Sequence, residues 1–382
     1  MRLRRALREK PSEAPSQKPP DKPSRRPRPP EGRGMAVGLV ATAALTALYT
    51  ALLHPEPGRL APLARWVRVF ELKTLDLRMA LRGGRTPSGR VVIVEIDERS
   101  IAALGRYPWP RHLYARLIDR LHAMGAQAVA LDVLLSEPSA PADDQALASA
   151  MARAANVFLV AHLDETPARR PPPHEGNQPP TAPTADLAYR HFANPPVRAT
   201  ARGSAGGGLS RPPRLAQLVM PIPALARQAR GIGLSELGPP DPDQVFRWVP
   251  LAVQADEPGR FYPPLALVLA LAVRGGSVQQ DAVLEFGRGV RSPQLGLVPT
   301  EPSGSLLVDF LGRARTFPYV SFVDVLEGRI DPKQVRGRVV LVGATAKGLA
   351  DFRSTPLAVL PGVEIHATVL ENLLSGRFIA LP

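Results

Sequence analysis

The segment VVIVEIDERSIAALGRYPWPRHLYARLIDRLHAMGAQAVALDVLL, residues 91–135, decides the fold. It opens with a run of mostly β-branched apolar residues, which is typical of a buried strand. From Pro110 to Met124 apolar side chains recur three and four positions apart, which indicates an amphipathic helix that Gly125 ends. The apolar run at 126–135 follows as a second buried strand. A strand, a helix and a strand in this order predict parallel strands with the helix packed on the sheet.

The same alternation continues after residue 135. Residues 143–155 (DDQALASAMARAA) predict a helix with an Asp at its N-cap, and residues 157–163 (VFLVAHL) predict a third strand. A hairpin is expected between Leu234 and Val253, around the turn at 239–243. Later elements are helices at 264–274, 322–326 and 365–374, and strands at 305–310 and 338–344. The fold class is therefore α/β: a mostly parallel sheet with helices on both faces.

A transmembrane helix is expected to precede this domain. Residues 35–53 (MAVGLVATAALTALYTALL) carry no charged side chain, and as a helix they would span ~28 Å, about one bilayer core. A buried helix would show a polar stripe, and a signal peptide would show a shorter basic region and a cleavage site. An uncleaved membrane anchor is therefore preferred. Arg side chains crowd its N-terminal flank, so the positive-inside rule places residues 1–34 in the cytoplasm and the rest outside.

Most of the excess charge lies outside the predicted domain. The net charge is +14, but residues 1–34 hold 11 Lys and Arg against 4 acidic residues, and residues 165–214 hold 7 Arg against 3 acidic residues. Both segments are rich in proline, so residues 1–34 are predicted to be a disordered tail and residues 165–214 a flexible insertion. Residues 1–34 contain no aromatic side chain and neither segment contains a recognition motif, which argues against nucleic acid as a partner. Residues 60–82 are predicted to form a juxtamembrane helix.

Enzymatic chemistry finds little support in the sequence. The chain has no cysteine, which excludes disulfides, thiolate nucleophiles and cysteine-based metal sites. The patterns G-x-S-x-G, H-E-x-x-H, G-x-G-x-x-G and the P-loop are absent, and the near matches at 231–237 (GIGLSEL) fail at required positions. Without a nucleophile paired to a base no catalytic mechanism can be written, so no catalytic residue, metal or cofactor is expected.

Candidate ligand-binding residues follow the predicted strands. Asp97 and Asp132 each end a strand, and ligands of open parallel sheets bind beyond the carboxyl ends of the strands. The two acids would suit a divalent or other cationic ligand; alternatively, Asp97 caps the next turn and Asp132 pairs with an Arg such as Arg111. Trp109 and Arg111 combine an aromatic wall with a guanidinium group, although Pro110 between them equally suits the first turn of a helix.

Three further residues are weaker candidates for the same site. Glu364 and His366 lie two apart where the last helix begins, and Arg247 follows the predicted hairpin. Residues two apart on a helix do not share a face, so a metal pair is not expected there unless the segment is extended. A histidine at this place more often satisfies a helix terminus.

Six segments, in order, resemble the second type of the bacterial CHASE domain, the cyclase and histidine-kinase associated sensory extracellular module. They are DLRMALRG (76–83), VVIVEIDERSIAALGRYPWPR (91–111), GAQAVALDVLLSEP (125–138), DPDQVFRWVPL (241–251), YPPLAL (262–267) and GRVVLVGATAKGLADFRSTPLAVLPGVEIHATVLENLLSGRF (337–378). Two positions depart from the family: Gln244 stands after Asp243 where Gly is usual, and Tyr107 stands where Trp is usual. Gln tolerates positive φ poorly, so the first departure predicts a different turn type.

The resemblance implies a signal-input domain of a bacterial receptor, held in the inner membrane with residues 60–378 on the periplasmic side. In that family transmembrane helices and a cyclase, kinase or diguanylate cyclase follow the sensor. A truncated gene, a split receptor with a separate cytoplasmic output protein as partner, and a stand-alone form are the alternatives that this order leaves open. The membrane and an unknown small-molecule or envelope ligand are the other expected partners. A homodimer is also open. The alternatives are an anchored metal-dependent hydrolase using Asp97, Asp132 and Asp143 or Asp144, and an envelope scaffold that recruits partners through residues 165–214.

Overall fold

The computed structural model describes residues 40, 42–43, 45–46, 61–164, 198–200, 217–255, 261–285 and 287–379. Two units are distinguished, residues 1–68 and residues 69–382. Within the described ranges, no helix is both long and apolar enough to cross a membrane. The predicted tail at 1–34, most of the predicted transmembrane helix at 35–53 and most of the insertion at 165–214 lie outside the described residues, so these three predictions stay open.

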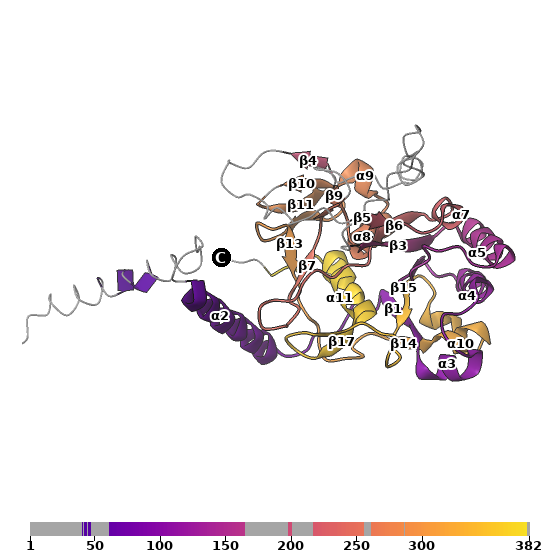
Figure 1. The fold of residues 1–382 in the computed structure, drawn as a ribbon, viewed down its shortest axis with the longest axis horizontal. Coiled ribbons are helices and arrows are strands. Elements are labelled where there is room, and N and C mark those ends of the chain that lie inside the picture. The colour runs from indigo at the N-terminus through magenta and orange to yellow at the C-terminus, as the bar shows by residue number, and fades with distance from the viewer. Residues whose placement is uncertain are drawn as a thin grey trace, which may run out of the picture. The chain divides into compact units, whose positions relative to one another are not determined.

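A seven-stranded sheet forms the centre of the second unit (Figure 1). Its strands, in spatial order, are β14 (Tyr319–Ser321), β1 (Val91–Ile96), β15 (Val339–Ala344), β2 (Ala128–Leu131) and β3 (Val157–Asp164), with β6 (Gly231–Leu234) and β5 (Gln217–Val219) both paired to β3. Every pairing in this sheet is parallel except that of β5 with β3. The predicted mostly parallel sheet is therefore confirmed.

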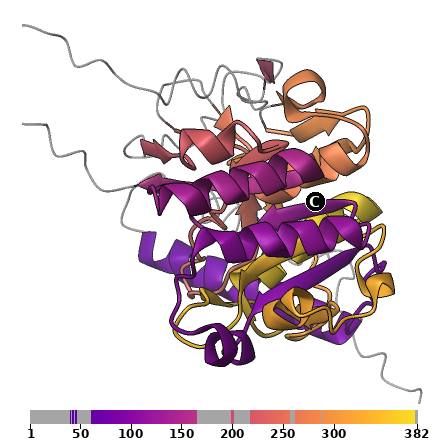
Figure 2. The same cartoon turned by 90° about the vertical axis from the view of Figure 1, so that its right-hand side faces the viewer.

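Helices cover both faces of this sheet (Figure 1). One face carries α3 (Glu98–Leu104), α4 (Arg111–Ala123), α5 (Pro141–Ala154), α7 (Pro223–Ala226) and α10 (Phe322–Leu326), and the other carries α8 (Leu265–Val273) and α11 (Gly362–Ser375). Alternate residues of β1 enter the two resulting cores: Val92 and Val94 lie in the first, Val91 and Ile93 in the second. Figure 2 shows α4 and α5 lying side by side over the first face. Because β1 is buried on both faces, its sequence is apolar almost throughout.

Proline sets where several helices begin. The helix predicted from Pro110 starts at Arg111 as α4. The helix predicted from Asp143 instead starts at Pro141, so Asp143 and Asp144 lie in its first turn and the predicted Asp N-cap is wrong. The fixed φ of Pro suits the first helical position, and carboxylates in the first turn still favour the positive end of the helix dipole.

The predicted hairpin between Leu234 and Val253 does not form. β6 stays in the parallel sheet, whereas β7 (Trp248–Pro250) pairs antiparallel with β13 (Ser305–Leu307). The prolines between β6 and β7 lack the N–H groups that a ladder needs. A tight turn forms there instead, in which the Gln244 N–H donates to the Asp241 carbonyl at 2.8 Å. Gln244 adopts a φ of 64°, the left-handed conformation for which glycine is usual.

Smaller sheets complete the second unit. They are β4 (Arg198–Thr200), β10 (Val283–Glu285), β11 (Gly289–Ser292) and β12 (Gly296–Pro299); β8 (Val253–Gln254) with β9 (Phe261–Tyr262); and β16 (Phe352–Ser354) with β17 (Val359–Pro361). The short helix α9 (Val278–Asp281) precedes β10, and the 3-10 helix η1 (Pro332–Gln334) lies between α10 and β15. β4 belongs to the insertion predicted at 165–214 and pairs with β10 in parallel. The helix predicted at 60–82 is α2 (Ala61–Arg82).

Candidate functional site

A cavity of about 670 Å³ opens beyond the carboxyl ends of β1 and β2. Two loops line it, the one that leads from α3 to α4 and the one that leads from β2 to α5. We call it the first cavity; its lining includes Tyr107, Trp109, Arg111, Tyr114, Leu134, Glu137 and Asp143. Its position is the one expected for ligands of an open parallel sheet. Two of the residues predicted from the sequence, Trp109 and Arg111, stand in its wall.

Both of these residues are firmly held. The Trp109 side chain is 5% exposed, its indole N–H donates to the Gly105 carbonyl at 2.9 Å, and its ring lies 4.9 Å from that of Phe322. The Arg111 guanidinium donates to Asp144 at 2.5 Å and to the Glu137 carbonyl. Arg111 therefore pairs with Asp144 and not with Asp132, so that alternative for Asp132 is wrong. The wall of the first cavity is preorganised by these contacts.

Asp97 serves the backbone at the start of α3. Its carboxylate accepts from the Ser100 N–H at 2.9 Å and from the Ser321 hydroxyl at 2.9 Å. This is the N-cap role that the sequence offered as the alternative to ligand binding. The hydrogen bond to Ser321 also links the end of β1 to β14, so the Asp97 carboxylate stabilises the fold at this point.

Asp132 and His366 are brought together from different parts of the chain. The Asp132 carboxylate has no hydrogen-bond partner among the described residues; burial and the neighbouring Asp351 raise its pKa, and His366 acts against this rise. The ring of His366, 2% exposed, lies with Nε2 3.1 Å from the Ser235 carbonyl. A carbonyl only accepts, so Nε2 carries the proton. Nδ1 is buried and has no partner in the described part of the chain.

Glu364 belongs to a different network from His366. It accepts from the Thr316 N–H at 2.9 Å and from the Tyr319 hydroxyl at 2.7 Å. Burial and the adjacent Glu364 raise the pKa of Tyr319 well above its usual range. The expectation that Glu364 and His366 do not share a face is confirmed, because their side chains contact different segments.

Glu95 is a buried carboxylate that the sequence analysis did not single out. Glu95, the residue before the end of strand β1, accepts two hydrogen bonds from Arg315, at 2.9 and 3.1 Å, and one from the Thr345 hydroxyl at 2.9 Å. The signal was available: a Glu inside the apolar run VVIVEI has to find a partner, because a buried charge without one is costly. Its partner Arg315, however, is far away in the sequence and could not be named.

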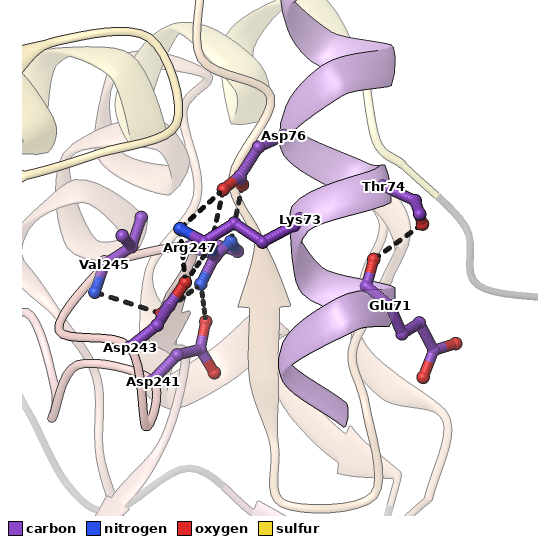
Figure 3. A network of polar contacts seen from close by, with 8 residues as sticks. All are labelled: Glu71, Lys73, Thr74, Asp76, Asp241, Asp243, Val245 and Arg247. Atoms are coloured by element: carbon purple, nitrogen blue, oxygen red, sulfur yellow. Dashed lines mark hydrogen bonds and ion pairs between the residues drawn. The ribbon is translucent and has the colours of Figure 1, made fainter. Parts of the chain in front are cut away.

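Arg247 is enclosed by three carboxylates (Figure 3). Its side chain is fully buried, and its five hydrogen bonds run to Asp76, Asp241 and Asp243 at 2.7–2.9 Å. Lys73 adds a second positive charge, 2.7 Å from Asp243. We call these five residues the Arg247 cluster. It joins α2, which supplies Lys73 and Asp76, to the turn that follows β6.

The charges of the Arg247 cluster stabilise one another. Burial alone would lower the pKa of Arg247, but the hydrogen bonds that it donates to Asp243, Asp76 and Asp241 raise it. The hydrogen bond that Asp243 accepts from Arg247 also holds the pKa of Asp243 well below its usual range. Arg247 and Glu364 thus form hydrogen bonds within the domain, and neither lines the first cavity.

The family model of the CHASE2 domain matches residues 43–382. The chain belongs to the CHASE2 domain family. The resemblance carried by the six sequence segments is confirmed, and all six lie in the matched range. No curated protein and no solved structure gives a match to the chain.

A second attachment joins α2 to the CHASE2 domain. Arg82, at the end of α2, donates to Asp309 and to the Phe310 carbonyl, and Arg85 donates to Asp309 at 2.6 Å. Asn372 of α11 bonds the backbone of Asp309 through both its side-chain oxygen and its side-chain nitrogen, at 2.9 and 3.1 Å. Between the two attachments, Leu75 and Met79 of α2 pack on the core. The C-terminal half of α2 is therefore a rigid part of the domain.

Within the described residues of the CHASE2 domain, no three His, Asp or Glu side chains gather so that they could hold a metal ion. The acids named for the hydrolase alternative are engaged elsewhere. Asp97 caps α3, Asp144 pairs with Arg111, and Asp143 lies 3.0 Å from His112. Of this set only Asp132 keeps a carboxylate without a hydrogen-bond partner in the described ranges.

Asp132→Asn is expected to raise the thermal unfolding midpoint at neutral pH. The pKa of Asp132 is raised on folding from its ordinary 3.8, so the folded state binds the proton more tightly and loses stability as pH rises through that value towards the folded pKa. The neutral amide avoids this loss. The gain should vanish below the ordinary pKa, where the carboxyl is protonated in both states.

The measurement is a series of thermal melts of the two proteins across pH. Asp119→Asn is the matched control, because Asp119 forms only an exposed pair with Arg153 and should show no such pH-dependent gain. If Asp132→Asn is less stable than the wild type at neutral pH, folding does not raise the pKa of Asp132.

Proposed function

We propose that this chain is the signal-input part of a membrane-bound bacterial receptor, anchored by residues 35–53, with the domain on the periplasmic side. CHASE2 domains are extracellular sensory domains of signal-transduction receptors, rather than catalytic domains. The ligand site is the first cavity, and the output is carried by another protein or another part of the receptor. The proposal rests above all on the attachment of α2.

The attachment of α2 makes that helix a suitable signal carrier. It follows the proposed anchor in the sequence, and the Arg247 cluster and Asp309 bond its C-terminal half to the domain at two separated points. A ligand acts on such a protein by binding one arrangement of the domain better than another. A change in the domain then moves α2 as a rigid element, and the anchor carries that motion to the membrane.

The first cavity is suited to a small ligand with an apolar or aromatic part. Its volume lies within the usual range of small-molecule sites. Tyr107 and Trp109 present aromatic surface, and Glu137 and Asp143 give the rim an acidic character. Burial also raises the pKa of Tyr107, so its hydroxyl stays protonated and can donate a hydrogen bond to a ligand.

A cavity-blocking variant tests this site. Leu134 lines the first cavity yet is 55% exposed, so Leu134→Trp should narrow the cavity at little cost to the fold. Small molecules would be screened against the full chain in lipid nanodiscs by thermal shift. A ligand at about 100 times its Kd stabilises the wild type by about 2.7 kcal/mol, and this gain should be lost in Leu134→Trp.

The control for bulk and surface hydrophobicity is Val359→Trp, at an exposed position of β17 outside the first cavity. It should respond to the ligand as the wild type does. If every stabilising compound acts equally on the wild type and on Leu134→Trp, the first cavity is not the ligand site.

A further inference from the structure

A second cavity, of about 740 Å³, lies next to the Arg247 cluster. Its walls are largely apolar and rigid, with Leu237, Pro239, Pro240, Pro250 and Phe261 among them. The charged groups in its lining are Glu236, Asp351 and Arg353, two carboxylates against one guanidinium. Pro239 and Pro240 directly precede Asp241 of the cluster, so one wall of the cavity is continuous with it.

The ion pair between Asp351 and Arg353 in this wall can be replaced by a pair with another cation. Arg353 donates to Asp351 at 2.6 Å, but the Asp351 side chain is 57% exposed and the Arg353 side chain 35%. Exposed ion pairs of this kind contribute little free energy, so another cation can replace Arg353 beside Asp351.

The surroundings of Asp351 favour a positive charge. Asp351 contributes to the raised pKa of Asp132, which shows that the negative charges of the two carboxylates reinforce each other. The Ser235 residue, in the wall of the cavity, accepts a hydrogen bond from His366 Nε2 through its carbonyl, and the buried Nδ1 of that ring has no partner among the described residues. Among the charged residues that line the cavity, the two carboxylates of Glu236 and Asp351 outnumber the one guanidinium of Arg353.

Arg353 also connects the cavity to α2. Its guanidinium stacks over the ring of Phe246, 4.6 Å from the centroid, and the Phe246 N–H donates to the Ser354 carbonyl at 2.7 Å. Phe246 is the residue before Arg247, which holds Asp76 of α2. A displacement of Arg353 thus acts on Phe246 and, through the adjacent residue, on the contact with α2.

We propose that the second cavity binds an amine with an apolar body. The ammonium group of this amine displaces Arg353 from Asp351 and thereby changes the contacts between the Arg247 cluster and α2. This goes beyond the function proposed above, because it concerns a different cavity and does not depend on the first one binding anything. The apolar body lies against the prolines and Phe261. The ammonium group lies against the carboxylate of Asp351.

The first test compares two probes that differ in charge. 2-Phenylethylamine carries an ammonium group, and 3-phenylpropanoate carries a carboxylate on a ring and chain of similar size. Both would be titrated into the full chain in nanodiscs by calorimetry. The amine should bind at least about tenfold more tightly. Equal affinity, tighter binding of the carboxylate, or no binding of either probe would overturn the proposal.

Two variants locate the amine. Asp351→Asn should weaken its binding up to about fivefold, the loss expected when one exposed ion pair is removed. Asp351 is exposed and its carboxylate bonds only Arg353 among the described residues, so the fold should be kept, and a thermal melt checks this. Asp143→Asn, in the first cavity, should leave the affinity unchanged. Equal losses in both variants would place the amine elsewhere.

The link to α2 has a readout of its own. Binding of 2-phenylethylamine should change the hydrogen exchange of backbone amides in residues 72–82. In Arg353→Gln, where no guanidinium stacks on Phe246, the amine should still bind but this change should be lost. Unchanged exchange in the wild type at saturation would show that the cavity does not act on α2.

Discussion

Arg247→Met is expected to lower the free energy of unfolding by about 3–5 kcal/mol, the usual cost of removing one partner from a buried ion pair. The substitution keeps most of the side-chain volume but leaves Asp76, Asp241 and Asp243 with Lys73 as their remaining cation in the cluster. Carboxylates that were desolvated against the guanidinium then lack a partner. Urea unfolding of the full chain in detergent, followed by tryptophan fluorescence, measures the change.

The pH dependence separates this effect from a general loss of packing. Arg247 lowers the pKa of Asp243 on folding, so the stabilisation is present above the ordinary aspartate pKa of 3.8 and is lost as pH falls through the folded pKa. The difference between wild type and Arg247→Met should therefore narrow in acid. Arg153→Met, which breaks the exposed pair with Asp119, is the control and should cost less than about 1 kcal/mol. A similarly small cost for Arg247→Met would contradict the prediction.

Gly233→Ala is expected to cost about 3 kcal/mol or more, at the upper end of overpacking substitutions. A Cβ atom at residue 233 would lie 2.4 Å from the Cα of Leu265 and 2.6 Å from its backbone nitrogen. These are backbone atoms at the start of α8, which cannot rotate away as a side chain can. The Leu234 N–H also donates to the Pro263 carbonyl at 2.9 Å, so β6 and α8 are held at this short distance.

The same urea unfolding experiment tests Gly233→Ala. Gly362→Ala is the matched control, because its Cβ would meet its nearest neighbours at 3.6 Å, an ordinary contact distance, and its φ is not positive. The control should change stability by less than about 1 kcal/mol. A wild-type unfolding midpoint for Gly233→Ala would mean that β6 and α8 can separate without cost.

Residues close together in the sequence allowed most of the fold to be predicted. The apolar strands β1, β2, β3 and β15 and the helices α4, α10 and α11 lie near their expected positions, because alternating buried elements impose their periodicity on the sequence. The hairpin was wrong because local turn signals at 239–243 do not determine which strand β7 will pair with. Its partner β13 lies more than fifty residues later in the chain.

The candidate site was only partly predictable. Asp97, Trp109 and Arg111 could be placed at the carboxyl end of the sheet, since each follows a recognisable strand. The neighbours of Asp132 could not, because His366 and Asp351 reach it from other elements. The three carboxylate partners of Arg247 could not be predicted either, because they meet it only when α2 and the turn after β6 pack together.

The sequence by itself determined the α/β class, the parallel sheet and the family, because periodicity, turn residues and the order of six segments are local properties of the chain. Only the tertiary structure decided which charged side chains form buried ion pairs and hydrogen bonds and which do not. Arg247 and Glu364 are engaged in buried networks, whereas the Asp132 carboxylate has no hydrogen-bond partner among the described residues and the Asp351–Arg353 pair is partly exposed. The physical reason is that the free energy of a charged group depends on the groups that surround it in space, and these come from segments that the fold alone brings together.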